Sequence, residues 1–443
     1  MIHRHVIEKI IKYIDSQKEH PNVLIIDGAR QVGKTTAILL ALKQRTPYLE
    51  INLEKQKQFR KAIDETQSFE EFEKVLKREF NFSPGEGTLL YIDEANESLW
   101  LAAYIRQMKE DWKNQKVILS GSMMYRLFRN KKIRVPVGRI ETLTVKPFSF
   151  KEYLLANEVT KSSLSKYGLF DLISDSEQIK KISSSDHQQL LSLLDHYLIS
   201  GGMPEIAISY LSNSANINIR NKHLEYLEVL KEDFLKLFSE EYSNLFDRTF
   251  SSVANLLGQP FKKTSIIRNN PKLADNLLTV FEKWKLVLKC EQKTFDPNAS
   301  NKFYPKRYLF DSGFAKTKRE MGLPSISIIA TLSSSQREPL GGLIEQVACN
   351  ELLIEYHDLC GYRENNYEID FIVKQQNITI PIECKASLKP NKNQYRSLDL
   401  FQKRYQNNKA VILSLAPFSK VQREKYVVYH IPIYAINAWQ DIL

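Results

Sequence analysis

Residues 28–35 have the spacing of a phosphate-binding loop, G-x-x-x-x-G-K-[ST]. A β-type run, Val23–Asp27, leads into this loop, and the residues that follow it have a helical pattern. Glycines let the backbone curl so that its N–H groups surround phosphates, aided by the positive end of the helix. The predicted ATP-binding residues are consecutive: Gly28, Ala29, Arg30, Gln31, Val32, Gly33, Lys34, Thr35 and Thr36. We expect Lys34 to bridge the β- and γ-phosphates and Thr35 to hold Mg²⁺.

Two acids end a second apolar run, Thr88–Ala95. In a phosphate-loop site the first acid, Asp93, would hold Mg²⁺ and the second, Glu94, would polarise the attacking water. The alternative is that the glycine-rich turn and the acidic strand end are unrelated. It is disfavoured because the strand, the loop, the helix and the acidic strand follow one another in the required order. The pattern therefore predicts ATP hydrolysis. A phosphate-loop kinase fits less well, since Glu94 beside Asp93 suits water activation.

Two more polar positions are candidate contacts of the γ-phosphate. Ser120 ends the strand-like run Lys116–Ser120, and either it or Ser122 could sense the phosphate at that strand tip. A simple polar turn explains these serines equally well. Arg139 is a candidate to touch the γ-phosphate in the same or a neighbouring subunit. A surface ion pair is an equally good explanation of Arg139.

The motifs resemble those of the AAA-type ATPases of bacteria and archaea in which a C-terminal domain of uncharacterised function follows the ATPase. The resemblance rests on Gly28–Thr35, Tyr91–Ala95, Ile118–Ser122, Gly138-Arg139, Pro147–Phe150 and Gly201–Glu205. It spans nearly the whole chain and implies an ATP-hydrolysing domain that uses Mg²⁺. Asn96 stands where the family usually has glutamine.

The middle of the chain is predicted to be mostly helical. Thr160–Asp186 is rich in serine and lysine, which favours an exposed connection. Leu190–Ser200 and the amphipathic His223–Phe238 are expected to form helices of a lid on the ATPase.

Beyond the lid, the helix, helix, strand and strand order looks like a winged helix, with Lys293–Lys306 as the wing. The resembled family usually carries such a domain. Four basic residues lie before or at the start of the second helix, namely Lys262, Lys263, Arg268 and Lys272. They could contact DNA phosphates without selecting a base sequence. A winged helix that packs only against protein is an equal alternative.

The last hundred residues contain a possible second site. After a predicted loop, Ser333–Pro339, a helix over Gly341–Tyr356 carries Glu345. Two strand-like runs follow, and a hairpin that turns at Gln376 and Asn377 pairs Phe371 with Ile382 and Val373 with Ile380. A slip of one residue would mix core and polar side chains, so this register is favoured.

The same register places Asp370 opposite Glu383, with Lys385 on the same face. Two facing carboxylates can hold Mg²⁺, and a neighbouring lysine can activate water. The arrangement resembles the D…E-x-K core of restriction-endonuclease-like (PD-(D/E)xK) nucleases, with Glu345 in the position of their helix acid. An ion-paired group on a retired nuclease scaffold is the alternative.

Composition narrows the class of partner. The net charge of the 443-residue chain is +11, which favours a polyanion such as DNA, while a protein partner or self-association stays open. The sequence contains neither a long apolar run nor a signal-peptide pattern, so we expect a cytoplasmic protein without a membrane partner.

We therefore predict an α/β chain that begins with a P-loop NTPase domain built on a parallel sheet, over residues 1–160. A helical lid or linker (161–238), a winged-helix-like domain (239–325) and an α/β restriction-endonuclease-like domain (335–443) would follow. The predicted function is an AAA-type ATPase coupled to a DNA-binding, nuclease-like C-terminal region. The alternative is an ATP-dependent regulatory switch that acts on a protein partner and has a catalytically inactive nuclease-like domain.

Overall fold

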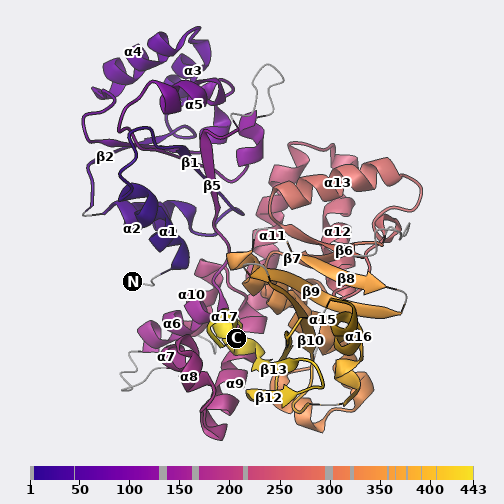
Figure 1. The fold of residues 1–443 in the computed structure, drawn as a ribbon. Coiled ribbons are helices and arrows are strands. Elements are labelled where there is room, and N and C mark those ends of the chain that lie inside the picture. Colours follow the sequence, from indigo (N-terminus) through magenta and orange to yellow (C-terminus); the bar gives the residue numbers. More distant parts are fainter. Residues whose placement is uncertain are drawn as a thin grey trace. The chain divides into compact units, whose positions relative to one another are not determined.

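A computed structural model of the chain describes residues 4–43, 45–128, 137–161, 169–212, 218–294, 303–319, 324–356, 359–364, 366–375, 378–390, 392–405 and 407–442. The chain forms two compact units (Figure 1). The first, here called the nucleotide unit, comprises His3–Lys146 with Lys283–Lys285. The second, called the C-terminal unit, comprises Pro147–Glu282 and Leu286–Leu443.

The nucleotide unit is built on a five-stranded sheet in which every pairing is parallel. Its strand order is β2-β3-β4-β1-β5. The strands are β1 (Val23–Asp27), β2 (Tyr48–Asn52), β3 (Leu89–Asp93), β4 (Val117–Ser120) and β5 (Ile140–Thr144). The prediction of a parallel α/β sheet is confirmed. Because β4 lies between β1 and β3, the ends of these three strands meet at one edge of the sheet.

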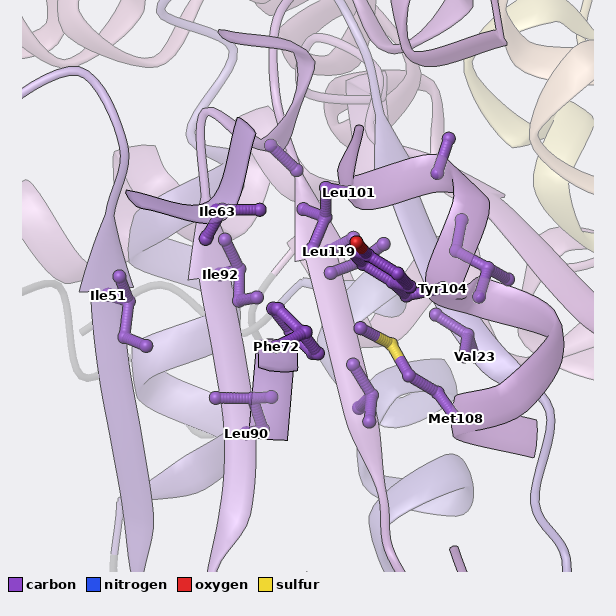
Figure 2. Close-up of a cluster of buried hydrophobic side chains, with 14 of the residues drawn as sticks. Val23, Ile51, Ile63, Phe72, Leu90, Ile92, Leu101, Tyr104, Met108 and Leu119 are labelled. Atoms are coloured by element: carbon purple, nitrogen blue, oxygen red, sulfur yellow. The ribbon is translucent and has the colours of Figure 1, made fainter. Parts of the chain in front are cut away.

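Helices cover both faces of this sheet. Figure 1 shows α1 (His5–Ile14) and α2 (Lys34–Leu42) on one face, and α3 (Lys57–Glu65), α4 (Phe69–Phe80) and α5 (Leu101–Glu110) on the other. Alternate strand residues such as Ile92 and Leu119 point toward the helices α3, α4 and α5. There they pack with Phe72 of α4 and Tyr104 of α5 (Figure 2). Burial of each large apolar side chain contributes roughly 1.5–3 kcal/mol. This core fixes the strand ends that carry the site.

The described residues at the start of the C-terminal unit form the helices α6 (Phe150–Lys161), α7 (Leu169–Ser174), α8 (Ser176–Ile179), α9 (Ser184–Ser200), α10 (Pro204–Ser212) and α11 (Ile219–Leu235). The predicted helices near Leu190–Ser200 and His223–Phe238 are confirmed. In its described part, the stretch predicted as an exposed connection over Thr160–Asp186 is mostly exposed or half-buried, but it is helical, because α7, α8 and the start of α9 lie there. Ser183 begins α9 by accepting a hydrogen bond from the Asp186 backbone N–H.

The next segment contains α12 (Ser243–Asn255), α13 (Pro271–Lys283), β6 (Val287–Lys293) and β7 (Lys306–Leu309). The predicted order of two helices and two strands is confirmed, whereas a winged-helix fold stays a prediction. Most of the predicted wing lies outside the described residues. Strand β6 pairs antiparallel with β7 and parallel with β8 (Cys360–Glu364), so this hairpin belongs to a larger sheet.

That larger sheet has eight strands in the order β12-β13-β11-β10-β9-β8-β6-β7. Its remaining strands are β9 (Tyr367–Gln375), β10 (Ile378–Lys385), β11 (Lys409–Ser414), β12 (Ser419–Gln422) and β13 (Val427–Pro432). Strand β10 is antiparallel to β9 and parallel to β11. The sheet is therefore continuous across the predicted boundary between residues 325 and 335.

The other described helices of this unit are α14 (Ser312–Lys318), α15 (Ser334–Glu355), α16 (Arg396–Tyr405) and α17 (Trp439–Ile442). The loop predicted over Ser333–Pro339 is wrong, because α15 already begins at Ser334. Ser333 and Gln336 form a reciprocal capping box, which starts the helix although Pro339 lies inside it. Among the described residues, no helix is both long and apolar enough to cross a membrane.

Candidate functional site

The phosphate loop follows the end of β1 and requires unusual backbone conformations. Gly28, Gln31 and Gly33 have φ values of +146°, +58° and +90°. An added Cβ atom at Gly28 would lie 2.3 Å from the carbonyl oxygen of Val145. Glycine is therefore needed at position 28 both for its conformation and for the close approach of another backbone segment.

Replacing Gly28 by alanine is expected to lower the free energy of unfolding of the nucleotide unit by at least about 3 kcal/mol. The matched control is Gly87→Ala, because Gly87 has a φ of +80° but nothing within 4 Å of an added Cβ. That control should cost only about 1 kcal/mol, the strain of the left-handed conformation alone. Chemical denaturation measures both variants, and equal losses would contradict the predicted clash.

Lys34 lies at the start of α2 with its side chain folded back over the loop. Its Nζ donates hydrogen bonds to the carbonyl oxygens of Gly28 (3.0 Å) and Ala29 (2.9 Å), and the residue is buried. Burial lowers the pKa of Lys34, and the nearby Glu94 and Asp93 oppose that shift. The loop thus holds a desolvated cation where the sequence predicted the phosphates.

Asp93, at the end of β3, is the centre of a polar group drawn from three strand ends and the start of α2. It accepts hydrogen bonds from Thr35 Oγ1 (3.2 Å), Asn52 Nδ2 (3.2 Å) and Ser120 Oγ (2.5 Å). The structure thus brings together Thr35 and Asp93, the two predicted protein ligands of Mg²⁺. One carboxylate and one hydroxyl fit Mg²⁺, which usually completes its shell with water and phosphate oxygens.

Glu94 follows Asp93 and has a left-handed backbone conformation, with a φ of +49°. Burial raises the pKa of its carboxyl group, Asp93 raises it further, and Lys34 opposes the shift. A carboxylate whose pKa is raised is a stronger base than an exposed one. The environment of Glu94 therefore suits the predicted role of polarising water.

Asn52 and Tyr91 are two members of this site that the sequence reasoning missed. Asn52 ends β2, next to β3, and Tyr91 lies within β3 with its hydroxyl 3.1 Å from Ser120 Oγ. The tyrosine and the serine together orient one oxygen of Asp93. Only the strand order could have shown that the end of β2 lies beside Asp93, because 41 residues separate Asn52 from it.

Arg139 lies beside the beginnings of the sheet's strands, whereas the phosphate loop lies beside their carboxyl ends. Its carbonyl oxygen accepts from the backbone N–H of Val23, at the start of β1, whereas the loop follows the end of that strand. Five strand residues put about 15 Å between these edges. Arg139 also pairs with Glu110 at 2.8 Å. This position lends no support to a contact with the γ-phosphate of the same subunit, and both that contact and one across subunits stay predictions.

The motif Gly201–Glu205 encloses a buried carboxylate in the C-terminal unit. Asp311 accepts hydrogen bonds from the backbone N–H groups of Gly202 (2.6 Å) and Gly313 (2.8 Å). An added Cβ at Gly201 would lie 2.1 Å from Asp311 Oδ1. Burial raises the pKa of Asp311 to about 6, although these N–H groups oppose the shift. Packing around Asp311 thus explains Gly201, whereas an added Cβ at Gly202 would lie 2.3 Å from the carbonyl oxygen of Phe148.

The raised pKa of Asp311 predicts a pH dependence of stability. The folded chain binds a proton more readily than the unfolded chain, so the contribution of Asp311 falls as pH rises from about 4 to about 6. Relative to Asp311→Asn, the wild type should lose up to about 3 kcal/mol of unfolding free energy across this window and little above it. Urea denaturation at several pH values measures this difference. A difference that stays constant from pH 4 to pH 6 would contradict the prediction.

The predicted hairpin register near the second site is confirmed: Phe371 pairs with Ile382 and Val373 with Ile380. Asp370 of β9 and Glu383 of β10 are the residues next to the Phe371–Ile382 pair in this register. The turn residues Gln376 and Asn377 lie outside the described residues. Glu383 is buried and forms an ion pair with Lys385 at 2.6 Å.

Lys306, which the sequence did not predict to lie in this site, forms ion pairs with its other acidic residues. Lys306 Nζ, from β7, lies 2.9 Å from both Glu345 Oε2 and Asp370 Oδ1, and it also pairs with Glu368. Burial raises the pKa of Glu345, as it does that of Glu383. Burial also opposes ionisation of Asp370, but Lys306 and Lys385 keep the pKa of Asp370 below its usual value. Within the described parts of the chain, no three His, Cys, Asp or Glu side chains are arranged to hold a metal ion by themselves.

Comparisons with known proteins agree with the geometry of the nucleotide unit. Residues 20–154 match a family described as "AAA domain". Residues 191–323 and 340–435 match two families described as domains of unknown function, DUF8612 and DUF4143. The search of curated proteins gives no significant match.

Several solved structures align with long parts of the chain at low identity. The Walker-type ATPase PABY2304 of Pyrococcus abyssi is 16% identical, with 72% of this chain and 96% of that chain covered and a TM-score of 0.41. The Aeropyrum pernix ORC1 protein, solved in complex with DNA, is 11% identical, with coverage of 71% and 91% and a TM-score of 0.31. Thermotoga maritima RuvB is 16% identical, with coverage of 64% and 87% and a TM-score of 0.27.

The family match covers the sheet, the phosphate loop and the acids at the end of β3. These are the features that the nucleotide unit places at one edge of a parallel five-stranded sheet. The nucleotide unit therefore combines the sheet and loop arrangement of a P-loop ATPase with a match to the AAA-domain family over residues 20–154.

Proposed function

We propose that this chain hydrolyses ATP with Mg²⁺ and couples the hydrolysis to binding of DNA by its C-terminal unit. The observation that carries the first part is the convergence of Thr35, Asn52 and Ser120 on Asp93, directly beside Glu94. A nucleotide site without hydrolysis would have no need of a second, half-buried acid whose pKa is raised.

Each residue of the site has a distinct part in the proposed reaction. The loop N–H groups and Lys34 would bind the phosphates, and Thr35 with Asp93 would hold the metal ion. Mg²⁺, when bound, supplies positive charge that offsets the charge on the phosphates. Glu94 would orient a water molecule and accept its proton. Asn52 and Ser120 would keep Asp93 in position.

Exposed basic residues around the start of α13 support the DNA-binding part. Lys262, Lys263, Arg268 and Lys272 are exposed, and Lys262 lies over the ring of Tyr304 with its Nζ 5.6 Å from the ring centroid. Lys263 is partly offset by Asp275. Such a group suits the DNA backbone, whose phosphates dominate affinity and make it depend on salt.

We also propose a restriction-endonuclease-like fold for residues 335–443. The order of elements in this segment is α15, β8, β9, β10, α16 and β11, with β10 antiparallel to β9 and parallel to β11, and this order supports the proposal. The positions of Glu345 on α15, Asp370 on β9 and Glu383 with Lys385 on β10 also support this proposal. The fold proposal makes no statement about cleavage.

Phosphate release, measured with and without single- and double-stranded DNA, tests the proposed function, with Glu94→Gln as the blank. DNA should stimulate turnover, and the double variant Arg268→Ala/Lys272→Ala should weaken the stimulation and its dependence on salt. Lys403→Ala, an exposed lysine of α16, is the control. Turnover that is indifferent to DNA would favour the regulatory switch that acts on a protein partner.

A further inference from the structure

The ammonium group of Lys306 lies inside the acidic cluster of the C-terminal unit, and the residue is only 1% exposed. It contacts three carboxylates, those of Glu345, Glu368 and Asp370. Two of these carboxylates also accept hydrogen bonds from other protein groups. Tyr308 donates its hydroxyl to Glu345 Oε2 (2.9 Å), and the Cys384 N–H donates to Asp370 Oδ2 (2.8 Å).

Lys306 reaches this cluster from a distant part of the sequence. It is the first residue of β7, where it pairs with Cys290 of β6, and it precedes Asp370 by 64 residues. Strand β6 then pairs with β8, the neighbour of β9. The β6–β7 hairpin therefore places the Lys306 ammonium group next to the acidic residues of the nuclease-like segment.

The charge balance decides what this cluster can bind. Burial alone would lower the pKa of Lys306, but Asp370, Glu345 and Glu368 raise it well above its usual value, so the side chain stays an ammonium. A divalent ion beside it would have to share the same carboxylate oxygens with a like charge. Glu383 has its own partner, Lys385. The residues present therefore do not fit a Mg²⁺ ion between Asp370, Glu383 and Glu345.

We propose that Lys306 takes the place of a divalent cation in this site, so that the C-terminal unit binds no metal ion there and does not cleave nucleic acid by a metal-dependent reaction. The Lys306 ammonium group instead acts as a permanent counter-ion that links β7 to α15 through Glu345 and to β9 through Asp370. This proposal rests on the nuclease-like fold proposed above and is independent of ATP hydrolysis. It also means that removing one side chain should open a metal site.

Binding of Mn²⁺ alone to the nucleotide-free full chain tests the proposal. Every protein compared carries Asp93→Asn, which silences metal binding in the nucleotide unit. With Lys306 present, Mn²⁺ should leave the melting temperature at its value in EDTA. Lys306→Met should melt on the order of 10 °C lower in EDTA, because buried carboxylates lose their counter-ion, and Mn²⁺ should restore much of the loss.

Electron paramagnetic resonance should count one more bound Mn²⁺ per chain in Lys306→Met than in the chain with Lys306. Adding Asp370→Asn to Lys306→Met should abolish both this binding and the thermal recovery. Lys231→Met, which removes a lysine paired with Asp247 elsewhere in the same unit, is the matched control and should show no recovery with Mn²⁺.

Two results would overturn the proposal. One is Mn²⁺ bound by the chain that retains Lys306 and lost on Asp370→Asn, a comparison that stays decisive if Lys306→Met does not fold. The other is a folded Lys306→Met chain that binds no additional Mn²⁺. None of these measurements involves ATP turnover, so they fail or succeed separately from the proposed hydrolysis.

Discussion

Glu94→Gln should reduce the rate of ATP hydrolysis by roughly 10²–10⁴-fold, the usual contribution of a positioned general base. The amide is almost the same shape as the carboxyl group but cannot accept a proton from water. Nucleotide affinity should stay within about twofold of the wild type, because Lys34, Thr35 and the loop N–H groups are unchanged. Steady-state phosphate release and equilibrium binding of a fluorescent ATP analogue measure the two effects.

Glu97→Gln is the matched control for this change. Glu97 lies three residues along the chain, in the short helix after β3, where it pairs with Arg60 at 3.1 Å. Because it is absent from the group around Asp93, its amide variant should hydrolyse ATP at close to the wild-type rate. If Glu94→Gln kept full turnover, another group would have to activate the water.

Lys34→Ala should weaken ATP binding by about 100-fold or more, since each charged hydrogen bond to a phosphate contributes roughly 1.5–3 kcal/mol. The wild-type lysine is already desolvated and held by the carbonyl oxygens of Gly28 and Ala29, so little ordering is needed when it meets a phosphate. Removing it should also lower turnover at saturating ATP, because the cation stabilises charge that moves during phosphoryl transfer.

Lys43→Ala tests whether the loss is specific to that position. Lys43 is an exposed lysine directly after the other end of α2, so its removal alters the net charge equally. Titration of both variants with ATP and with ADP gives the comparison. Similar affinities in the two variants would show that Lys34 makes no contact with the phosphates.

Several parts of the structure could be predicted because they depend on local sequence. The phosphate loop has glycine at positions 28 and 33, where φ is positive, and it lies between a strand and a helix, all within 23–42. The Phe371–Ile382 register followed from side-chain alternation, because a shift of one residue would expose the apolar face of β10. The starts of α9 and α15 depend on the capping residues Ser183 and Ser333, so both helices begin earlier than apolar periodicity alone predicts.

The sequence by itself determined the chemistry of the nucleotide site and the order of helices and strands around it, since these follow from spacing and periodicity over short stretches. Only the tertiary structure decided which distant residues join each site. The order of the parallel strands set Asn52 and Ser120 against Asp93 and put Arg139 at the far edge. Pairing of β6 with β8 set Lys306 among Glu345, Glu368 and Asp370. Strand pairing between segments far apart in the chain depends on the whole packed core, so no local pattern encodes it.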